Sequence, residues 1–274
     1  MGRRIKLLDA NFNDGKGWQP GVSMHCAPQQ VTWDRVRPEL DPSLVVITDH
    51  KLDTRVRART RIAWLVESPD VMPHIYDPAR TDYARFKRVI TFHRGLLNTI
   101  PNAVEGLMGG TTLRRSDIAL WPKSKLVSMV ASTKGWTEGH KFRLQVADRL
   151  APALDLFGRG RSQALEFKID GLKDYAFSVA AENGRVPDYF SEKLIDCFLT
   201  GTVPIYWGVP TVGRWFNLDG ILRFDTVEEA ERCVAALTMD KYLAMLPAVT
   251  DNYHRAQRFV CPEDEYLRLG WFNP

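Results

Sequence analysis

The segment Phe177–Gly208 (FSVAAENGRVPDYFSEKLIDCFLTGTVPIYWG) constrains the fold more than any other part of the chain. It starts with an apolar run typical of a buried strand, continues through a polar loop into a helical stretch, and ends in a second apolar run. A strand, a helix and a strand in this order favour a parallel pair joined by a right-handed crossover. The polar residues of the loop and the helix start are Glu182, Asn183, Glu192 and Lys193. Such a junction offers N–H groups and a lysine to phosphates, and it offers carboxylates to ribose hydroxyls. It therefore predicts a nucleotide-diphosphate site.

The rest of the chain repeats the alternation of strands and helices. In the second half we predict strands at Lys125–Ala131, Leu154–Phe157, Ala176–Ala180, Val203–Tyr206 and Ile221–Phe224, and helices at Glu138–Leu150, Tyr189–Thr200 and Val227–Leu237. In the first half we predict strands at Ile5–Leu8, Leu44–Thr48, Ile62–Val66 and Val89–Phe92, with turns at Gly15–Gly21 and Pro38–Pro42. This alternation indicates an α/β protein with parallel sheets.

The stretch Asn98–Pro122 carries three glycines and two prolines and is expected to join the two halves. We therefore predict an α/β domain over residues 1–122, a nucleotide-binding α/β domain over 123–250 and a helical extension over 251–274. The predicted fold is two Rossmann-like, doubly wound domains that face each other across a cleft.

Composition narrows the class of protein without deciding it. The chain has 274 residues and a formal net charge of +4, which is compatible with a phosphorylated ligand, an anionic membrane surface or nucleic acid. Its four cysteines have no paired spacing, so neither a zinc site nor a disulfide framework is expected. The first residues lack an apolar run of signal-peptide length, and no window is apolar enough for a membrane span. A cytoplasmic location is expected.

Several motifs of this sequence occur in one known family. In the α1,3-fucosyltransferases, glycosyltransferase family 10, a Glu-Asn pair precedes a Tyr-x-x-Glu-Lys motif and a Val/Ile-Pro-Val/Ile run. The segment Ala180–Trp207 resembles this signature, with Glu182-Asn183, Tyr189–Lys193 and Val203–Ile205 in the same order and spacing. Upstream, Val130–Ser132, Leu154–Arg159 and the Glu-Ser-Pro motif within Trp64–Pro69 are similar to further family segments.

The resemblance implies a GT-B fold and an inverting, metal-independent sugar transfer from GDP-fucose. Departure of a nucleoside diphosphate leaves negative charge that a cation must stabilise. By the resemblance, Arg143 falls where the family has its phosphate-binding arginine. Because the sequence contains no Asp-x-Asp motif, Arg143 and Lys193 could supply that charge instead of a metal ion. By the resemblance, Glu67 is the general base that takes the proton from the acceptor hydroxyl. The other reading of Glu67 is a surface carboxylate. No cofactor or metal is expected beyond the GDP-sugar substrate.

The resemblance also assigns residues to the donor. It implies that Asn183 and Tyr189 contact the donor, that Glu192 binds the ribose hydroxyls, and that Ser132 and Tyr175 line the nucleotide site. Glu182 is expected near the sugar, with a structural salt bridge as the alternative, and Tyr175 could instead be a core residue.

Three functions stay open at this point. The first is a cytoplasmic fucosyltransferase-like enzyme, free or peripheral to the inner membrane, that acts on a glycan acceptor such as lipopolysaccharide. The second is a glycosyltransferase that modifies bases of phage-type DNA, although the sequence has no basic run with interleaved aromatic residues that would indicate a DNA-binding groove. The third is a non-catalytic nucleotide-sugar-binding protein. Trp18, Trp33 and Trp64 could stack on sugar rings or belong to the core. The sequence indicates no oligomeric state.

Overall fold

The computed structural model describes residues 2–12, 19–35, 43–107, 109–161 and 163–274, which form two compact units. Unit 1 contains the chain up to Gly110 together with Pro187–Tyr189 and Phe259–Pro274, and unit 2 contains Thr111–Val186 and Phe190–Arg258. The chain thus changes unit after Gly110, whereas the sequence-based boundary follows residue 122. The last part of the predicted C-terminal extension groups with unit 1.

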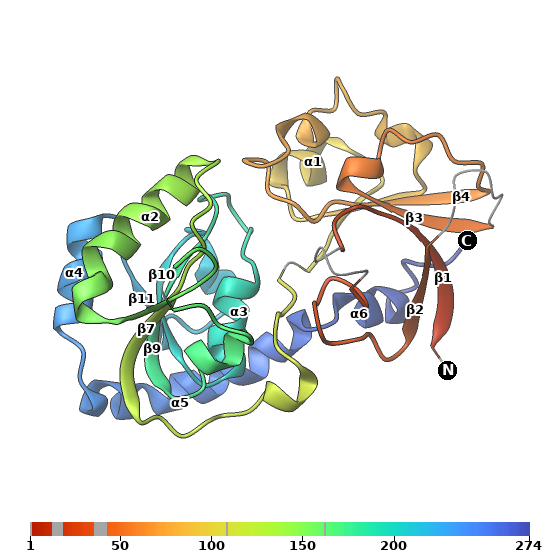
Figure 1. The fold of residues 1–274 in the computed structure, drawn as a ribbon. Helices are drawn as coiled ribbons and strands as arrows, with labels where there is room; N and C mark the ends of the chain where they lie inside the picture. Colours follow the sequence, from red (N-terminus) through yellow and green to blue (C-terminus); the bar gives the residue numbers. More distant parts are fainter. Residues whose placement is uncertain (1, 13–18, 36–42, 108, 162) are drawn as a thin grey trace. The chain divides into compact units, whose positions relative to one another are not determined.

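Unit 1 is built on a six-stranded parallel sheet with the strand order β2-β1-β3-β4-β5-β6 (Figure 1). Its strands are β1 (Arg3–Leu8), β2 (Val31–Arg35), β3 (Leu44–Thr48), β4 (Thr60–Trp64), β5 (Arg88–Thr91) and β6 (Ala103–Glu105). The four predicted strands are confirmed with small shifts of their ends. β2 and β6 were not predicted, and β6 lies within the stretch expected to be a join. The predicted turn at Pro38–Pro42 lies outside the described residues, as does most of Gly15–Gly21.

The helices of unit 1 are α1 (Arg94–Thr99) and α6 (Pro262–Arg268). α6 contributes Tyr266 to an aromatic core, where its ring meets that of Trp64 edge-on at 5.5 Å between centroids. Trp33 packs on Trp64 in the same cluster, and both tryptophans are at least nine-tenths buried. They are therefore core residues and not platforms for a sugar, while Trp18 lies outside the described residues.

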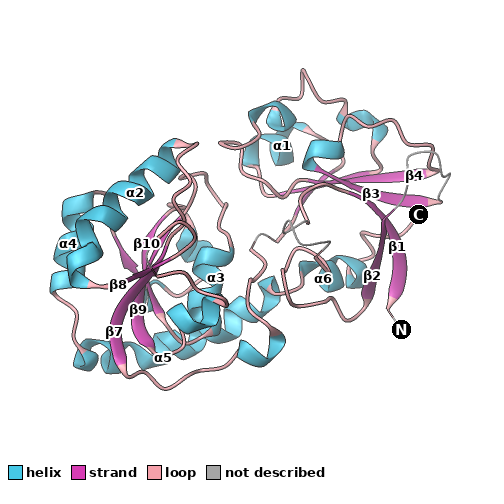
Figure 2. Ribbon diagram, in the orientation of Figure 1, coloured by secondary structure: helices cyan, strands magenta, loops and turns pink. Residues whose placement is uncertain are grey.

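Unit 2 contains a five-stranded parallel sheet with the order β11-β10-β9-β7-β8. Its strands are β7 (Lys125–Val130), β8 (Asp155–Phe157), β9 (Tyr175–Ala181), β10 (Val203–Trp207) and β11 (Leu222–Arg223). Its helices are α2 (Glu138–Leu150), α3 (Glu192–Leu199), α4 (Val227–Ala235) and α5 (Met239–Ala256). α2 packs against α4 and α3 against α5. In each unit, helices and loops surround the strands (Figure 2).

Helix α3 begins three residues later than predicted, because its N-terminal cap is Ser191. The Ser191 side chain accepts a hydrogen bond from the N–H of Lys193, which satisfies one of the amides that a helix start leaves without an internal partner. Asp188, three residues upstream, has a positive φ of 60° and pairs with Arg94. The apolar face of α3 is buried; it comprises Leu194, Ile195, Phe198 and Leu199.

Both sheets have the same doubly wound order, in which the first strand lies between the second and the third. In unit 1 the strand order therefore reverses between β1 and β3, and in unit 2 it reverses between β7 and β9. Ligands of such sheets bind beyond the carboxyl ends of the strands at this switch point. The loops after β3 and β4 in unit 1, and after β7 and β9 in unit 2, are thus the places to search for a site.

No helix in the part of the chain that the structure describes has both the length and the apolar character needed to cross a membrane.

Candidate functional site

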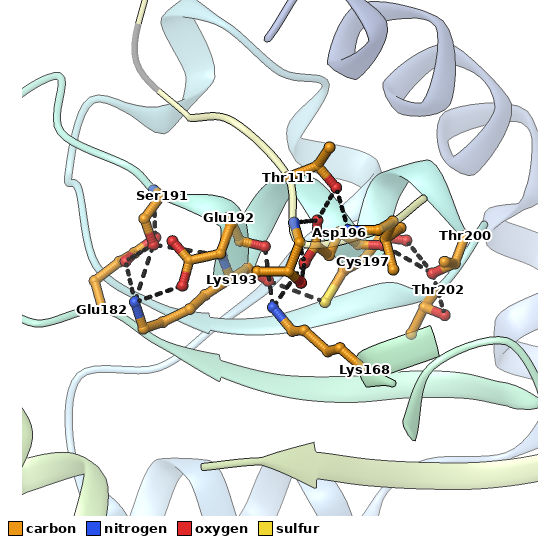
Figure 3. Close-up of polar contacts among 12 residues, drawn as sticks. Thr111, Lys168, Glu182, Ser191, Glu192, Lys193, Asp196, Cys197, Thr200 and Thr202 are labelled. Atoms are coloured by element: carbon orange, nitrogen blue, oxygen red, sulfur yellow. Dashed lines mark hydrogen bonds and ion pairs between the residues drawn. The ribbon is translucent and has the colours of Figure 1, made fainter. Parts of the chain in front are cut away.

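The centre of the site in unit 2 is Glu182, which directly follows β9 and is completely buried. Its two carboxylate oxygens accept hydrogen bonds from the backbone N–H of Ser191 at 2.9 Å and from the Ser191 hydroxyl at 2.6 Å (Figure 3). The Nζ of Lys193 lies 3.7 Å from the same carboxylate. A buried carboxylate needs such partners because its desolvation is otherwise unfavourable. Glu182 thus fixes the start of α3 to the end of β9, which is the structural role left open by the sequence.

Lys193 points back toward this carboxyl edge of the sheet. Its Nζ donates to the Ser191 hydroxyl at 3.1 Å and pairs with the Glu192 carboxylate at 3.2 Å (Figure 3). Burial alone would raise the pKa of Glu192, but the charges of Lys193 and Lys168 lower that pKa to about 2. Glu192 is therefore a carboxylate at any physiological pH, and its side chain is about one-third exposed. It can accept hydrogen bonds from hydroxyl groups of a ligand at this place.

The second cation of the site is Arg143, which α2 carries on its buried face. Only 4% of Arg143 is exposed, and its Nη1 donates to the side-chain oxygen of Asn183 at 3.1 Å. Its Nε is buried and has no hydrogen-bond partner among the described residues. Burial lowers the pKa of this guanidinium, while Glu182 and Glu192 favour its charged form. A buried guanidinium with an unsatisfied N–H is suited to bind a further anion.

The backbone of Asn183 is held against the first turn of α2. Its carbonyl oxygen accepts a hydrogen bond from the Thr137 hydroxyl at 2.9 Å. A Cβ atom on Gly139 would lie only 2.2 Å from the same oxygen, so the helix can approach this closely only with glycine there. This contact sets the position of α2, and with it the position of Arg143 relative to Asn183.

A buried ion pair between Lys168 and Asp196 holds α3 in place. The Nζ of Lys168 lies 2.9 Å from the Asp196 carboxylate, which is fully buried (Figure 3). Asp196 also accepts hydrogen bonds from the hydroxyls of Thr111 and Thr112, the first two residues of unit 2. A small cavity beside this network is lined by Lys168 and Lys193 together with Ser178 and the end of β9. The pair holds the helix that presents Glu192 and Lys193.

In unit 1 the candidate residue Glu67 lies three residues after the end of β4 and is half-buried. Its peptide N–H donates to the carboxylate of Asp49 at 3.0 Å, and its peptide oxygen accepts a hydrogen bond from the Tyr76 hydroxyl. The structure therefore holds the backbone of Glu67 at the carboxyl edge of the sheet of unit 1.

The structure brings most of the predicted donor residues together within unit 2. Lys193 forms ion pairs with Glu182 and Glu192. Arg143 donates to Asn183, the residue after Glu182, and the charges of Glu182 and Glu192 act on its guanidinium. The sheet register pairs Met129 with Val179, so Ser132 lies at the same edge of the sheet as Glu182.

Tyr175 and Tyr189 are the remaining predicted donor residues. Tyr175 is the first residue of β9, so it lies seven residues, or about 23 Å, from Glu182 along the strand. Its hydroxyl donates to Asp155 at 2.7 Å, and the side chain is buried as a core residue. Tyr189 groups with unit 1, where its ring packs on Phe92 at 5.3 Å between centroids. Neither contact connects these tyrosines with the group around Glu182.

Two residues that contact the candidate site residues or their helix, Asp49 and Lys168, were not predicted. Asp49 directly follows the apolar strand Leu44–Thr48, and an acidic residue at a strand's end is a signal that the sequence contains. Lys168 follows no such pattern, since its partner Asp196 is 28 positions away on another element. No group of three or more His, Cys, Asp or Glu side chains suited to a metal ion occurs among the described residues.

Known proteins resemble this chain in sequence and in fold. Residues 120–255 match the family description "Glycosyltransferase family 10 (fucosyltransferase) C-term". A putative fucosyltransferase-like protein of Arabidopsis thaliana is 31% identical over 135 residues, which are 47% of this chain and 25% of that protein. Alpha-(1,3)-fucosyltransferase FucT of Helicobacter pylori is 36% identical over 76 residues, 28% of this chain and 15% of that protein. The chain thus matches a quarter or less of the length of these curated relatives.

Solved structures show the same fold over nearly the whole chain. An α1,3-fucosyltransferase with GDP has a TM-score of 0.60 and 18% identity, covering 97% of this chain and 91% of the other. An α1,3-fucosyltransferase with GDP-fucose has a TM-score of 0.59 and 16% identity, covering 97% and 90%. The fold is therefore the α/β GT-B fold with two Rossmann-like units, as the sequence predicts. With the family match over residues 120–255 in addition, the chain belongs to glycosyltransferase family 10, the fucosyltransferase family.

Proposed function

We propose that this protein is an inverting glycosyltransferase that moves fucose from GDP-fucose to a hydroxyl group of a glycan acceptor. The observation that carries the proposal is the buried Arg143, whose Nε has no partner among the described residues and which donates to Asn183 in the loop that leads to Lys193 and the start of α3. Two cations and a helix N-terminus form a site for a diphosphate. The α1,3-fucosyltransferase structure that matches in fold contains GDP-fucose, which supports this donor.

In the proposed reaction the bond between the sugar and the diphosphate breaks as the acceptor oxygen attacks the opposite face of the sugar. Negative charge then builds up on the diphosphate, where Arg143 can donate two parallel hydrogen bonds and Lys193 can place a compact charge. Glu192 accepts hydrogen bonds from the ribose hydroxyls. Cations that the protein already holds in position stabilise the leaving group without the reorganisation that water would need. The proposed reaction therefore needs no metal ion.

The acceptor hydroxyl must lose a proton as it attacks, and Glu67 is the proposed base. A positioned carboxylate in this role typically accelerates a reaction by about 10²–10⁴-fold. The proposed acceptor is a cell-envelope oligosaccharide of the lipopolysaccharide type, and the proposed location is the cytoplasm or the inner face of the membrane.

The proposal is tested with the Glu67→Gln variant. We measure the release of GDP from GDP-fucose in EDTA, with a panel of oligosaccharide acceptors, and determine the affinity for GDP by calorimetry. We expect turnover to fall by at least about 100-fold while the affinity for GDP stays the same, because Glu67 acts on the acceptor. Asp53→Asn, at an exposed carboxylate of the same unit, serves as the control. Full turnover in Glu67→Gln would remove this residue from the base role, and failure of the wild type to bind GDP would overturn the donor assignment.

A further inference from the structure

The peptide unit of Glu67 is held on both sides by buried side chains. On the amino side, the Asp49 carboxylate accepts hydrogen bonds from the N–H of Val66 at 2.8 Å and from that of Glu67 at 3.0 Å. On the carboxyl side, the Tyr76 hydroxyl donates to the peptide oxygen of Glu67. A loop residue held through both its N–H and its C=O has little freedom to move its Cα atom.

Asp49 is itself held in place. Only 1% of this residue is exposed, and it follows β3 directly, in register with the loop after β4. The side-chain amide of Asn11 donates to its Oδ2 at 2.9 Å, and the oxygen of that amide accepts a hydrogen bond from the Thr48 hydroxyl at 3.2 Å. A chain of contacts thus connects the ends of two neighbouring strands with the backbone of Glu67.

We propose that Asp49 is a positioning residue, whose carboxylate fixes the backbone of Glu67 so that the Glu67 side chain stays aimed at the acceptor hydroxyl. This inference rests on the proposed role of Glu67 as the base. A base misplaced by about 1 Å can lose on the order of 100-fold in rate, so a rigid support for Glu67 has a large kinetic effect. Asp49 acts through the peptide of Glu67 and need not touch a substrate.

A purely structural role explains less well than a positioning role why residue 49 is an aspartate. Burial, in the first place, and the charge of Glu67 raise the pKa of Asp49 to about 8, against the three N–H donors that favour its ionised form. Tyr76 and Tyr83 also face Asp49, but burial raises the pKa of both phenols, which stay neutral. The Asp49 carboxyl group is thus kept next to Glu67 although burial and that charge both disfavour its ionised form.

The first test needs no activity. In NMR spectra of the wild type, the amide signals of Val66 and Glu67 should shift with pH together with the Asp49 carboxyl signal, because these groups share hydrogen bonds. In Glu67→Gln the midpoint of the Asp49 titration should fall by on the order of one pH unit, since the neighbouring charge is gone. If the amide signals of Val66 and Glu67 do not shift as Asp49 titrates, the proposal is overturned, whatever the role of Glu67.

The second test is kinetic and uses the release of GDP from GDP-fucose into water, which requires no known acceptor. Asp49→Asn keeps the shape of the side chain but turns one acceptor into a donor that faces N–H groups. We expect kcat to fall by about 100-fold with an unchanged KM for GDP-fucose, and a smaller fall of kcat in Tyr76→Phe.

The matched control is Glu263→Gln, at a fully buried carboxylate of the same unit that accepts a hydrogen bond from the N–H of Val22 at 2.7 Å. This variant should lose a comparable amount of thermal stability but keep its kcat. If Asp49→Asn lowers kcat no more than Glu263→Gln does, Asp49 has no positioning role. If Glu67→Gln keeps full activity, the base assignment fails instead, and the NMR experiment still decides whether Asp49 holds the loop.

Discussion

The carboxyl edges of the two sheets hold carboxylates in opposite electrostatic surroundings. In unit 2, Glu192 lies next to Lys193 and Lys168, which lower its pKa to about 2 although burial alone would raise it. In unit 1, Asp49 is buried next to Glu67, and burial together with that charge raises its pKa to about 8. The same strand order therefore presents a cationic site in one unit and a proton-binding site in the other.

The largest expected effect concerns the cationic half of this comparison. Replacing Arg143 by Ala should weaken GDP binding by about 100- to 1000-fold, because water cannot replace the charged hydrogen bonds of a buried guanidinium at the proposed diphosphate site. Calorimetry with GDP measures this change. The control is Arg149→Ala on the same helix, where the exposed side chain pairs with Glu231. Equal affinities of the two variants would show that Arg143 does not bind the diphosphate.

The buried ion pair beneath α3 should contribute to stability and not to chemistry. Lys168→Met leaves the fully buried Asp196 without its cation, and we expect the free energy of unfolding to fall by about 3 kcal/mol. Lys173→Met breaks an exposed pair with Asp170 and should cost less than about 1 kcal/mol. Denaturant titrations of both variants measure the difference, and equal losses would mean that burial does not distinguish the two pairs.

The opposite pKa shifts predict opposite dependences of stability on pH. The raised pKa of Asp49 stabilises the folded state below about pH 4, and this contribution is lost as the pH rises toward about 8. The lowered pKa of Glu192 gives stability that is present above pH 4.5 and is lost as the pH falls toward 2. Between pH 4 and 8, Asp49→Asn should therefore reduce the decline of the unfolding free energy by up to about 1.4 kcal/mol per pH unit. An unchanged slope in this variant would show that Asp49 titrates normally.

The smallest effect is expected at Tyr175, which lies at the amino end of β9. Tyr175→Phe removes the hydrogen bond to Asp155 and should cost about 1 kcal/mol of stability. The affinity for GDP should change less than twofold. A loss of GDP affinity well beyond that would return Tyr175 to the nucleotide site implied by the family resemblance.

The elements of unit 2 could be predicted almost residue by residue, because its central strands are short apolar runs separated by clear turns. Glu138–Leu150, for example, has the predicted bounds of α2. Unit 1 was harder to predict. The edge strand β2 (VTWDR) includes two charged residues, and β6 has only three residues, all half-buried, so neither has an apolar run. The exception in unit 2 is its long helix α5, which was missed; it contains Pro247, which usually indicates a helix end.

The candidate site was predictable where its residues are close in the sequence. Glu182, Asn183, Glu192 and Lys193 lie within one strand–loop–helix segment, so a local pattern could identify them. Arg143 and Glu67 came from the family resemblance. The contacts of Asp49 with the Glu67 loop and of Lys168 with Asp196 depend on which strands and helices become neighbours, and one sequence does not contain that information.

The central claim is that the carboxyl edge of unit 2 binds a diphosphate through protein cations. Calorimetric titration of the wild-type protein with GDP and with guanosine, both in EDTA, tests it most directly. We predict that GDP binds with a micromolar dissociation constant and that guanosine binds at least about 100-fold more weakly, since Arg143 and Lys193 lose their anion. Equal affinities for the two ligands, or no binding of GDP, would contradict the account.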